Sequence, residues 1–107
     1  MALTIYGIKT CDTCRKARKA LPHAEFHDMR ETPLDSATIA RFLALFGDAL
    51  VNKSSTTWRA LSDADKARAP ADLLAENPTL MKRPVIDTGD AVLLGWKPDV
   101  QATLGVA

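Results

Sequence analysis

Two cysteines, Cys11 and Cys14, form a C-x-x-C pattern and are the only cysteines in this chain of 107 residues. They follow a short apolar run, Leu3 to Tyr6, and precede a stretch of strong helix formers that Pro22 ends. A cysteine at such a helix start meets unpaired backbone N–H groups and the positive end of the helix dipole, which favour the thiolate. We therefore expect Cys11 to attack a disulfide, with Cys14 one turn later available to resolve the mixed disulfide.

Cationic residues lie on both sides of this pattern. Arg15 stands four residues after Cys11, on the same face of the expected helix, and Lys9 lies two residues before it. Both are expected to stabilise the Cys11 thiolate, and Thr10 in the same loop is a candidate for substrate binding. A simpler alternative stays open, in which Cys14 is a small core residue and Cys11 acts alone or not at all.

Two histidines, His23 and His27, follow the cysteines with an H-x-x-x-H spacing that zinc-binding proteins also use. Eight residues separate Cys14 from His23, whereas a zinc finger needs about twelve between its two ligand pairs. His27 also falls within an expected strand, whose geometry does not bring a ligand back to the helix start. We predict no metal site and take both histidines as surface or strand-edge residues.

A third feature, Arg83-Pro84, precedes the apolar pair Val85-Ile86. Proline cannot donate to a sheet ladder and belongs at the start or edge of a strand, which is one sufficient explanation for it. The alternative is a cis-proline facing the C-x-x-C loop, whose neighbouring backbone receives an extended thiol-bearing substrate. Arg83 would then bind a carboxylate or oxyanion through its planar fork of donors.

The elements that must position these residues follow from the apolar pattern. One helix is especially clear, with Asp35 as N-cap, Gly47 after its end, and an apolar face of Ile39, Phe42, Leu43 and Phe46. We further expect strands at 3–6, 24–29, 85–86 and 91–94, helices at 12–21, 71–76 and 98–104, a helix start at Ser62, a polar connection at 52–57 and a hairpin turn at 87–90. This order predicts one compact α/β domain over residues 1–107, with a helical insertion at about 35–80.

The composition excludes several classes of protein. Lys plus Arg number 14 against 13 Asp plus Glu, so the net charge is +1 and the basic field of a nucleic-acid-binding protein is missing. No apolar run approaches the ~20 residues that span a bilayer, and the segment from Met1 to Tyr6 lacks the pattern of a signal peptide. We therefore expect a cytoplasmic protein, in a reducing compartment where a structural disulfide is not expected.

The segment from Tyr6 to Ala17, YGIKTCDTCRKA, is the longest part of a pattern that resembles the ArsC/Spx/YffB family. The other parts, in order along the chain, are Phe26–Asp28, Thr56–Arg59, Lys82–Pro84 and Leu94–Trp96. The resemblance implies a thioredoxin-like fold with a helical insertion and a four-stranded mixed sheet (order 2-1-3-4), in which only the third strand is antiparallel to the rest. It also implies that Cys11 is the reactive thiol and that Arg83-Pro84 lies at the active site with a cis bond.

The branches of this family differ in chemistry. Its arsenate reductases match Cys11 and Arg15 but add a histidine four residues before the cysteine and three further arginines around the oxyanion. Gly7 replaces that histidine here, while Asn52 and Gly95 replace two of the arginines and Arg83 keeps the other. An arsenate dianion then loses much of its charge stabilisation, so the resemblance implies little arsenate reduction.

Two other branches account for the remaining motifs. Thr56–Arg59 and Leu94–Trp96 resemble the YffB-type branch, whose members are regarded as glutathione-dependent thiol reductases. The C-x-x-C motif with its flanking residues is close to that of the Spx branch, regulators that bind RNA polymerase. The resemblance therefore implies a glutathione-dependent thiol–disulfide oxidoreductase. A redox-sensing Spx-like interaction protein is the alternative, followed by a true arsenate reductase.

Glutathione is the expected co-substrate, glutathione or a glutathionylated or disulfide-bonded protein is the expected partner, and no cofactor is expected to stay bound. Lys9, Arg59 and Arg83 are candidates to hold the glutathione carboxylates, with Pro84 beside the docking backbone. For Arg59 the alternative is a solvated residue at a helix end. Trp58 and Trp96 are expected to serve packing. We expect a monomer that binds neither nucleic acid nor membrane.

Overall fold

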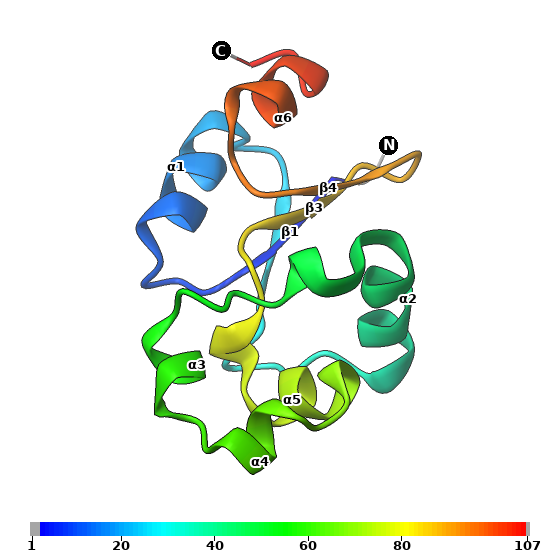
Figure 1. The fold of residues 1–107 in the computed structure, drawn as a ribbon. Helices are drawn as coiled ribbons and strands as arrows, with labels where there is room; N and C mark the ends of the chain where they lie inside the picture. The colour runs from blue at the N-terminus through cyan, green and yellow to red at the C-terminus, as the bar shows by residue number, and fades with distance from the viewer. Residues whose placement is uncertain (1–2, 107) are drawn as a thin grey trace. The chain divides into compact units, whose positions relative to one another are not determined.

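The structure is a computed structural model that describes residues 3–106. The chain divides into two compact units, a sheet unit of residues 1–32 and 83–107 and a helical unit of residues 33–82 (Figure 1). The helical unit contains the insertion predicted at about 35–80, and the grouping of the whole chain into one domain stays a prediction. Within residues 3–106, no helix has both the length and the apolar character to span a bilayer.

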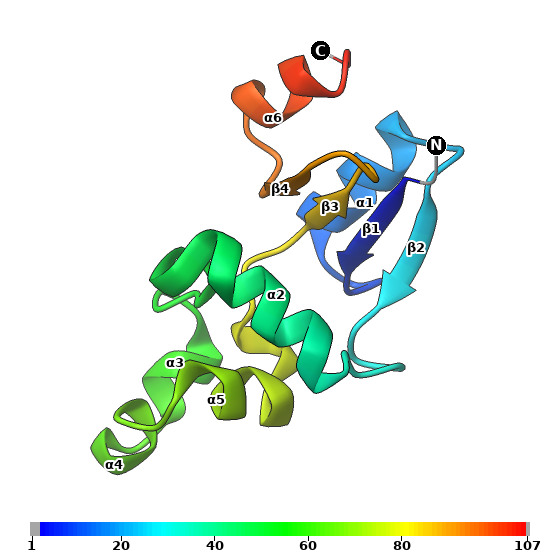
Figure 2. The same ribbon diagram turned by 90° about the vertical axis from the view of Figure 1, so that its right-hand side faces the viewer.

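The sheet unit contains four strands and two helices (Figure 2). Its elements are β1 (Thr4–Gly7), α1 (Asp12–Ala20), β2 (Glu25–Asp28), β3 (Val85–Asp87), β4 (Val92–Leu94) and α6 (Pro98–Thr103). The strand order is β2-β1-β3-β4, with β1 parallel to β2 and with β3 antiparallel to both of its neighbours. The predicted mixed sheet is therefore confirmed, and most of the expected boundaries differ by one or two residues.

One row of side chains explains why both helices of this unit pack on the same sheet face. Ile5 pairs with Phe26 on one side and with Ile86 on the other, and Ile86 pairs with Leu93. Residues paired across neighbouring strands point to the same face, so these four form a continuous apolar row. The row packs against buried residues of α1 and α6, namely Ala17 and Val100, and against Leu21.

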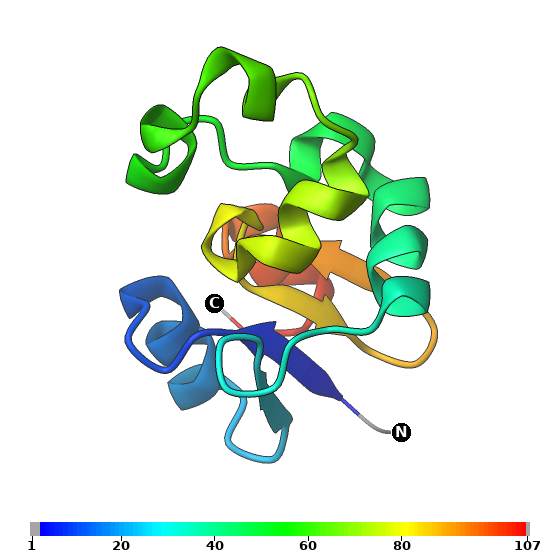
Figure 3. The same ribbon diagram turned by 90° about the horizontal axis from the view of Figure 1, so that it is seen from below.

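The helical unit is built from α2 (Ser36–Phe46), η1 (Gly47–Leu50), α3 (Thr56–Ala60), α4 (Asp63–Lys66), α5 (Pro70–Glu76) and η2 (Pro78–Leu80). The predicted cap of α2 is confirmed, because the Asp35 side chain accepts a hydrogen bond from the Thr38 backbone at 2.8 Å. In Figure 3, α2 (teal) and α5 (yellow-green) lie side by side. Their buried residues include Ile39 and Phe42 of α2 and Leu73 and Leu74 of α5.

Helix α3 was not expected, since residues 52–57 were interpreted as a polar connection. The Ser55 side chain accepts a hydrogen bond from the Trp58 backbone at 3.1 Å, which starts a helix of five residues. A helix this short shows no repeated apolar face, so periodicity could not indicate it. The capping serine was the local signal that could have done so.

Candidate active site

The turn from Ile8 to Cys11 places the first cysteine at the N-terminus of α1. The Cys11 N–H donates to the Ile8 carbonyl at 3.0 Å, which closes the turn, and the Cys11 carbonyl then accepts from Arg15 N–H at 3.0 Å. Cys11 is the N-cap residue, with extended backbone angles of φ −79° and ψ 122°. It is partly exposed. The predicted position of Cys11 at the helix start is confirmed.

The Cys11 thiolate is stabilised by its neighbours. Partial burial alone would raise the pKa of Cys11, but hydrogen bonds from the backbone and thiol of Cys14, and from the guanidinium of Arg83 with its charge, bring that pKa below its ordinary value. These donors converge on one sulfur. The geometry therefore favours a nucleophilic thiolate at Cys11.

Cys14 lies in the opposite environment. Its side chain is fully buried, and this desolvation, together with the nearby Cys11 charge, raises the pKa of Cys14 to about 12, although the Ile8 backbone donates to its sulfur. Both cysteines are free thiols in the structure. Cys14 is therefore a protonated thiol that donates to Cys11 rather than a second thiolate.

Gly7 makes room for the buried sulfur of Cys14. A Cβ atom at position 7 would lie 2.5 Å from Cys14 Sγ, 3.2 Å from Cys14 Cβ and 3.3 Å from the ring of Phe26. No side chain fits at that distance without displacing α1 or β2. The sequence identifies Gly7 only as the residue that replaces the histidine of the arsenate reductases, and the structure adds its contact with Cys14.

Arg83 and Pro84 enter the sheet unit directly before β3. The peptide bond between them is cis, as expected, and Pro84 is fully buried. The Pro84 carbonyl accepts a hydrogen bond from Gly95 N–H at 2.8 Å, which fixes this segment to the residue after β4. The Arg83 side chain reaches the Cys11 sulfur, so residues far apart in sequence meet at one site.

The cations near Cys11 in the sequence have other partners in the structure. Arg15 Nε donates to the Lys9 carbonyl at 3.0 Å, and its guanidinium lies 3.8 Å from the Asp12 carboxylate. The Lys9 ammonium pairs with Glu31 at 3.0 Å. The cation that lowers the Cys11 pKa is Arg83, which corrects the expectation that Arg15 and Lys9 do so. Sequence proximity suggested the wrong cations because side-chain direction was unknown.

Comparison with known proteins gives this site a family. The model of the ArsC family matches residues 6–104. The chain belongs to the ArsC family. An uncharacterized protein of Haemophilus influenzae is 44% identical over 104 residues, spanning 88% of this chain and 90% of that protein.

Two further proteins are similar to this ArsC-family chain over most of its length. The solved structure of a YffB protein superposes with a TM-score of 0.88 at 35% identity, covering 95% of this chain and 97% of that one. The global transcriptional regulator Spx of Streptococcus agalactiae is 25% identical over 107 residues, which is 91% of this chain and 78% of Spx. The predicted thioredoxin-like, arsenate reductase-like fold is thereby confirmed.

Other residues of the ArsC-family pattern lie as follows. Thr10 is exposed in the turn before Cys11. Gly95 has a positive φ of 87°, which favours glycine at that position. Asn52 and Arg59 belong to the helical unit, where the Asn52 side chain accepts from Ser54 N–H at 3.1 Å and Arg59 Nη2 donates to the Ser54 carbonyl at 2.7 Å.

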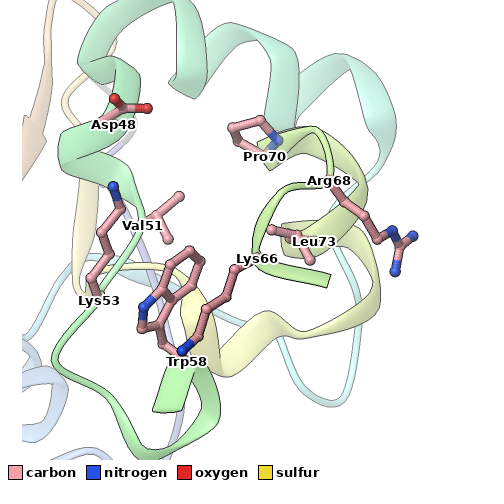
Figure 4. A pocket seen from close by; sticks show the side chains of 8 residues that line it. All are labelled: Asp48, Val51, Lys53, Trp58, Lys66, Arg68, Pro70 and Leu73. Carbon is pink, nitrogen blue, oxygen red and sulfur yellow. The ribbon is translucent and has the colours of Figure 1, made fainter. Parts of the chain in front are cut away.

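The tryptophans differ from each other. Trp96 is partly buried against the core of the sheet unit, as expected. Trp58 is half-buried in the helical unit, where Lys53 and Lys66 each place their ammonium 5.7 Å from the centre of its ring (Figure 4). These three residues line a cavity of about 100 Å³ in the helical unit. The other lining residues are Asp48, Val51, Arg68, Pro70 and Leu73.

The two histidines lie in different surroundings. His23 is exposed, and His27 Nε2 lies 2.7 Å from the Thr32 carbonyl while its ring lies 5.3 Å from that of Tyr6. Across residues 3–106, no three His, Cys, Asp or Glu side chains are grouped as metal ligands would be.

Proposed function

We propose that this ArsC-family protein is a thiol–disulfide reductase that uses glutathione as co-substrate. The observation that carries the proposal is the convergence of Arg83 and Cys14 on the sulfur of Cys11. A partly exposed thiolate at a helix N-terminus, beside a protonated thiol, is the arrangement that disulfide exchange requires. Belonging to the ArsC family and similarity to YffB support it.

The first step is attack of the Cys11 thiolate on one sulfur of a substrate disulfide. A bond forms between Cys11 and that sulfur, the substrate disulfide breaks, and the other sulfur leaves as a thiolate that takes a proton from water. The substrate loses its disulfide and the protein carries a mixed disulfide. Reduction of the substrate is complete only when a second thiol releases the half that is still bound to Cys11.

The second step is release of the bound group by either Cys14 or glutathione. In the first route Cys14 loses its proton to water, its sulfur bonds to Cys11, the mixed disulfide breaks and the bound group leaves as a thiolate; two molecules of glutathione then reduce the Cys11–Cys14 disulfide and become oxidised glutathione. In the second route a glutathione thiolate attacks the sulfur of the bound group, which frees the Cys11 thiolate and leaves that group joined to glutathione as a disulfide. Mixed-disulfide formation removes the Cys11 charge that helps to raise the pKa of Cys14, and so makes Cys14 more acidic when it is needed. Burial, the largest cause of the raised pKa, persists, so glutathione competes as the resolving thiol.

Substrate binding is assigned to the residues around Cys11. Arg83 and Lys9 are proposed to contact the glutathione carboxylates, with Thr10 and the backbone at Pro84 forming the docking edge. Arg59 of the helical unit is a further candidate for a carboxylate. The proposal includes a monomeric protein in a reducing compartment such as the cytosol, where the two thiols would be kept reduced.

Mass spectrometry after incubation with oxidised glutathione tests the proposal. A glutathione adduct on Cys11, or a loss of two hydrogens that joins Cys11 to Cys14, supports disulfide exchange, and which of them appears identifies the resolving thiol. Steady consumption of glutathione with a mixed-disulfide substrate is expected in parallel. An unmodified protein in the first assay, together with no consumption of glutathione in the second, would show that the proposal is wrong.

A redox-switched interaction protein is the second candidate, favoured by the C-x-x-C motif and by the similarity to Spx. A sensor changes its binding once per oxidation, whereas a reductase consumes reductant continuously. Arsenate reduction with glutaredoxin is expected to be weak or absent, since Asn52 and Gly95 replace two of the arginines that the resemblance implies around the oxyanion.

A further inference from the structure

Lys9, two residues before Cys11, has both of its backbone polar groups held by charged side chains. Its N–H donates to Asp28 Oδ2 at 3.0 Å. Its carbonyl accepts from Arg15 Nε at 3.0 Å. One residue of the turn is therefore held from β2 on one side and from α1 on the other, by charge-assisted hydrogen bonds.

The Asp28 carboxylate is placed to hold two turns at once. It is the last residue of β2, it pairs in register with Gly7, and only 8% of it is exposed. While Oδ2 accepts from Lys9, Oδ1 accepts from the N–H groups of Arg30 at 2.8 Å and Glu31 at 3.1 Å. These donors outweigh the effect of burial, which would raise its pKa, and keep the pKa of Asp28 below its ordinary value.

This turn determines where both sulfurs lie. The Cys11 N–H closes the turn on the Ile8 carbonyl, and the Ile8 N–H donates to the Cys14 sulfur, so Lys9 lies between the two contacts. A rotation of the Lys9 backbone would move Cys11 away from its donors on Cys14 and Arg83. The Lys9 side chain adds little to the hold on the turn, because its ammonium is half-exposed and its ion pair with Glu31 lies at the surface.

We propose that Asp28 and Arg15 are positioning residues for the Cys11 thiolate, which act by holding the Lys9 backbone rather than through their charges. They do not touch the reacting sulfur in this scheme. The inference concerns the position of the thiolate. Only its effect on turnover rests on the proposed function.

Charge and position give opposite expectations for Asp28. A negative carboxylate near a thiolate destabilises it, so replacing Asp28 by asparagine should make Cys11 more acidic if charge alone matters. Asparagine offers only one acceptor oxygen, and its amide nitrogen would face either the Lys9 N–H or the N–H groups of the following turn. If position matters, Asp28→Asn loosens the turn and makes Cys11 less acidic.

Arg15 offers a matched pair of variants. In Arg15→Gln, the amide nitrogen stands the same number of bonds from the backbone as Arg15 Nε, so it can still donate to the Lys9 carbonyl without a charge. Arg15→Met removes both the charge and the donor. Since Arg15 is exposed, neither variant empties the core.

The experiment measures the rate at which iodoacetamide alkylates each cysteine from acid to alkaline pH, with the sites resolved by mass spectrometry. We expect Asp28→Asn and Arg15→Met to slow Cys11 at neutral pH about fivefold, with little change in the alkaline limiting rate, because the thiolate fraction falls. Arg15→Gln should stay within about twofold of the unchanged protein. Glu31→Gln, which removes only an exposed ion pair, is the control and should behave likewise.

Equal slowing in Arg15→Gln and Arg15→Met, or faster alkylation in Asp28→Asn, would overturn the inference. If Asp28→Asn does not unfold cooperatively, the Arg15 pair alone decides. Iodoacetamide needs no disulfide-binding site, so an absence of turnover in the unchanged protein would remove the proposed function and leave this result intact.

Discussion

The N-cap of α1 and the buried face of its first turn each hold a cysteine, but in two different environments. At the N-cap, Cys11 is partly exposed and receives hydrogen bonds from Cys14 and Arg83, and its pKa is lowered. One turn later, Cys14 is enclosed against Gly7, and burial raises its pKa to about 12. Three residues of separation therefore suffice to divide one motif into an attacking thiolate and a protonated thiol.

The contrast comes from what each sulfur faces, rather than from the helix alone. Both cysteines lie in the first turn of α1, where the helix dipole favours a thiolate at either. Desolvation opposes that effect in both, and it prevails at Cys14, which no solvent reaches. At Cys11 the effect of desolvation is offset by hydrogen bonds from Cys14 and from Arg83, which lies before β3 and is distant in the sequence.

Removal of each thiol should give the largest difference between them. Cys11→Ser is expected to reduce thiol–disulfide turnover to the background, a loss of about a thousandfold, because the thiol that remains, Cys14, is fully buried and its pKa is raised to about 12. Cys14→Ser should retain turnover with glutathione as the resolving thiol, or accumulate the mixed disulfide on Cys11. Steady-state assays with intact-mass analysis measure both, and full activity in Cys11→Ser would end the redox interpretation.

Gly7→Ala tests the space that keeps Cys14 buried. The added methyl would lie 2.5 Å from Cys14 Sγ, so the free energy of unfolding should fall by about 1–3 kcal/mol as α1 or β2 shifts. In a Cys14→Ala background the sulfur is gone, and the same substitution should cost less, although the contact with Phe26 remains. Urea unfolding of the four proteins gives the coupling. Equal costs in both backgrounds would show that Cys14 does not limit position 7.

Much of this contrast could be predicted from the sequence. A helix start is a local feature, marked by the change from an apolar run to helix formers, so the N-cap position of Cys11 was predictable. A core position for Cys14 was one of the two interpretations of that residue, and the sheet order followed from a resemblance spread over nearly the whole chain.

The partners of the charged groups could not be predicted in the same way. Arg15 is near Cys11 in the sequence, but its side chain donates to the Lys9 carbonyl. Arg83 follows the helical unit in the sequence, far from Cys11, and yet its side chain reaches the Cys11 sulfur. The role of Asp28 depends on strand register, which sets its carboxylate beside the turn before α1. Direction and register are three-dimensional quantities that spacing along the chain does not contain.

Arg83→Met sharpens the comparison on the Cys11 side. Loss of the guanidinium removes a hydrogen bond and a positive charge from the thiolate, so alkylation of Cys11 at neutral pH should slow about tenfold. Lys9→Met is the matched control. Its ammonium pairs with Glu31, and its removal should change the rate by less than about twofold. If Lys9→Met slowed alkylation more than Arg83→Met, Lys9 rather than Arg83 would be the cation that stabilises the Cys11 thiolate, as sequence proximity suggested.

The smallest expected effect is the dependence of stability on pH, in which the two thiols act with opposite signs. An unfolded cysteine titrates near pH ~8.5. Because the folded pKa of Cys11 is lowered, its stabilising contribution is present above that value and is lost as the pH falls through the folded pKa. Because the folded pKa of Cys14 is raised, its contribution is present below that value and is lost as the pH rises toward about 12.

Urea unfolding under reducing conditions, across a series of pH values, separates these two contributions. Subtracting the curve of Cys11→Ser from that of the unchanged protein cancels the other titrating groups and should leave a difference that grows as the pH rises toward ~8.5. Subtracting the curve of Cys14→Ser should leave a difference that shrinks above the same pH. The second slope continues to about pH 12. Two differences that run in the same direction would mean that the cysteines share one environment, and the division of labour within the first turn of α1 would be lost.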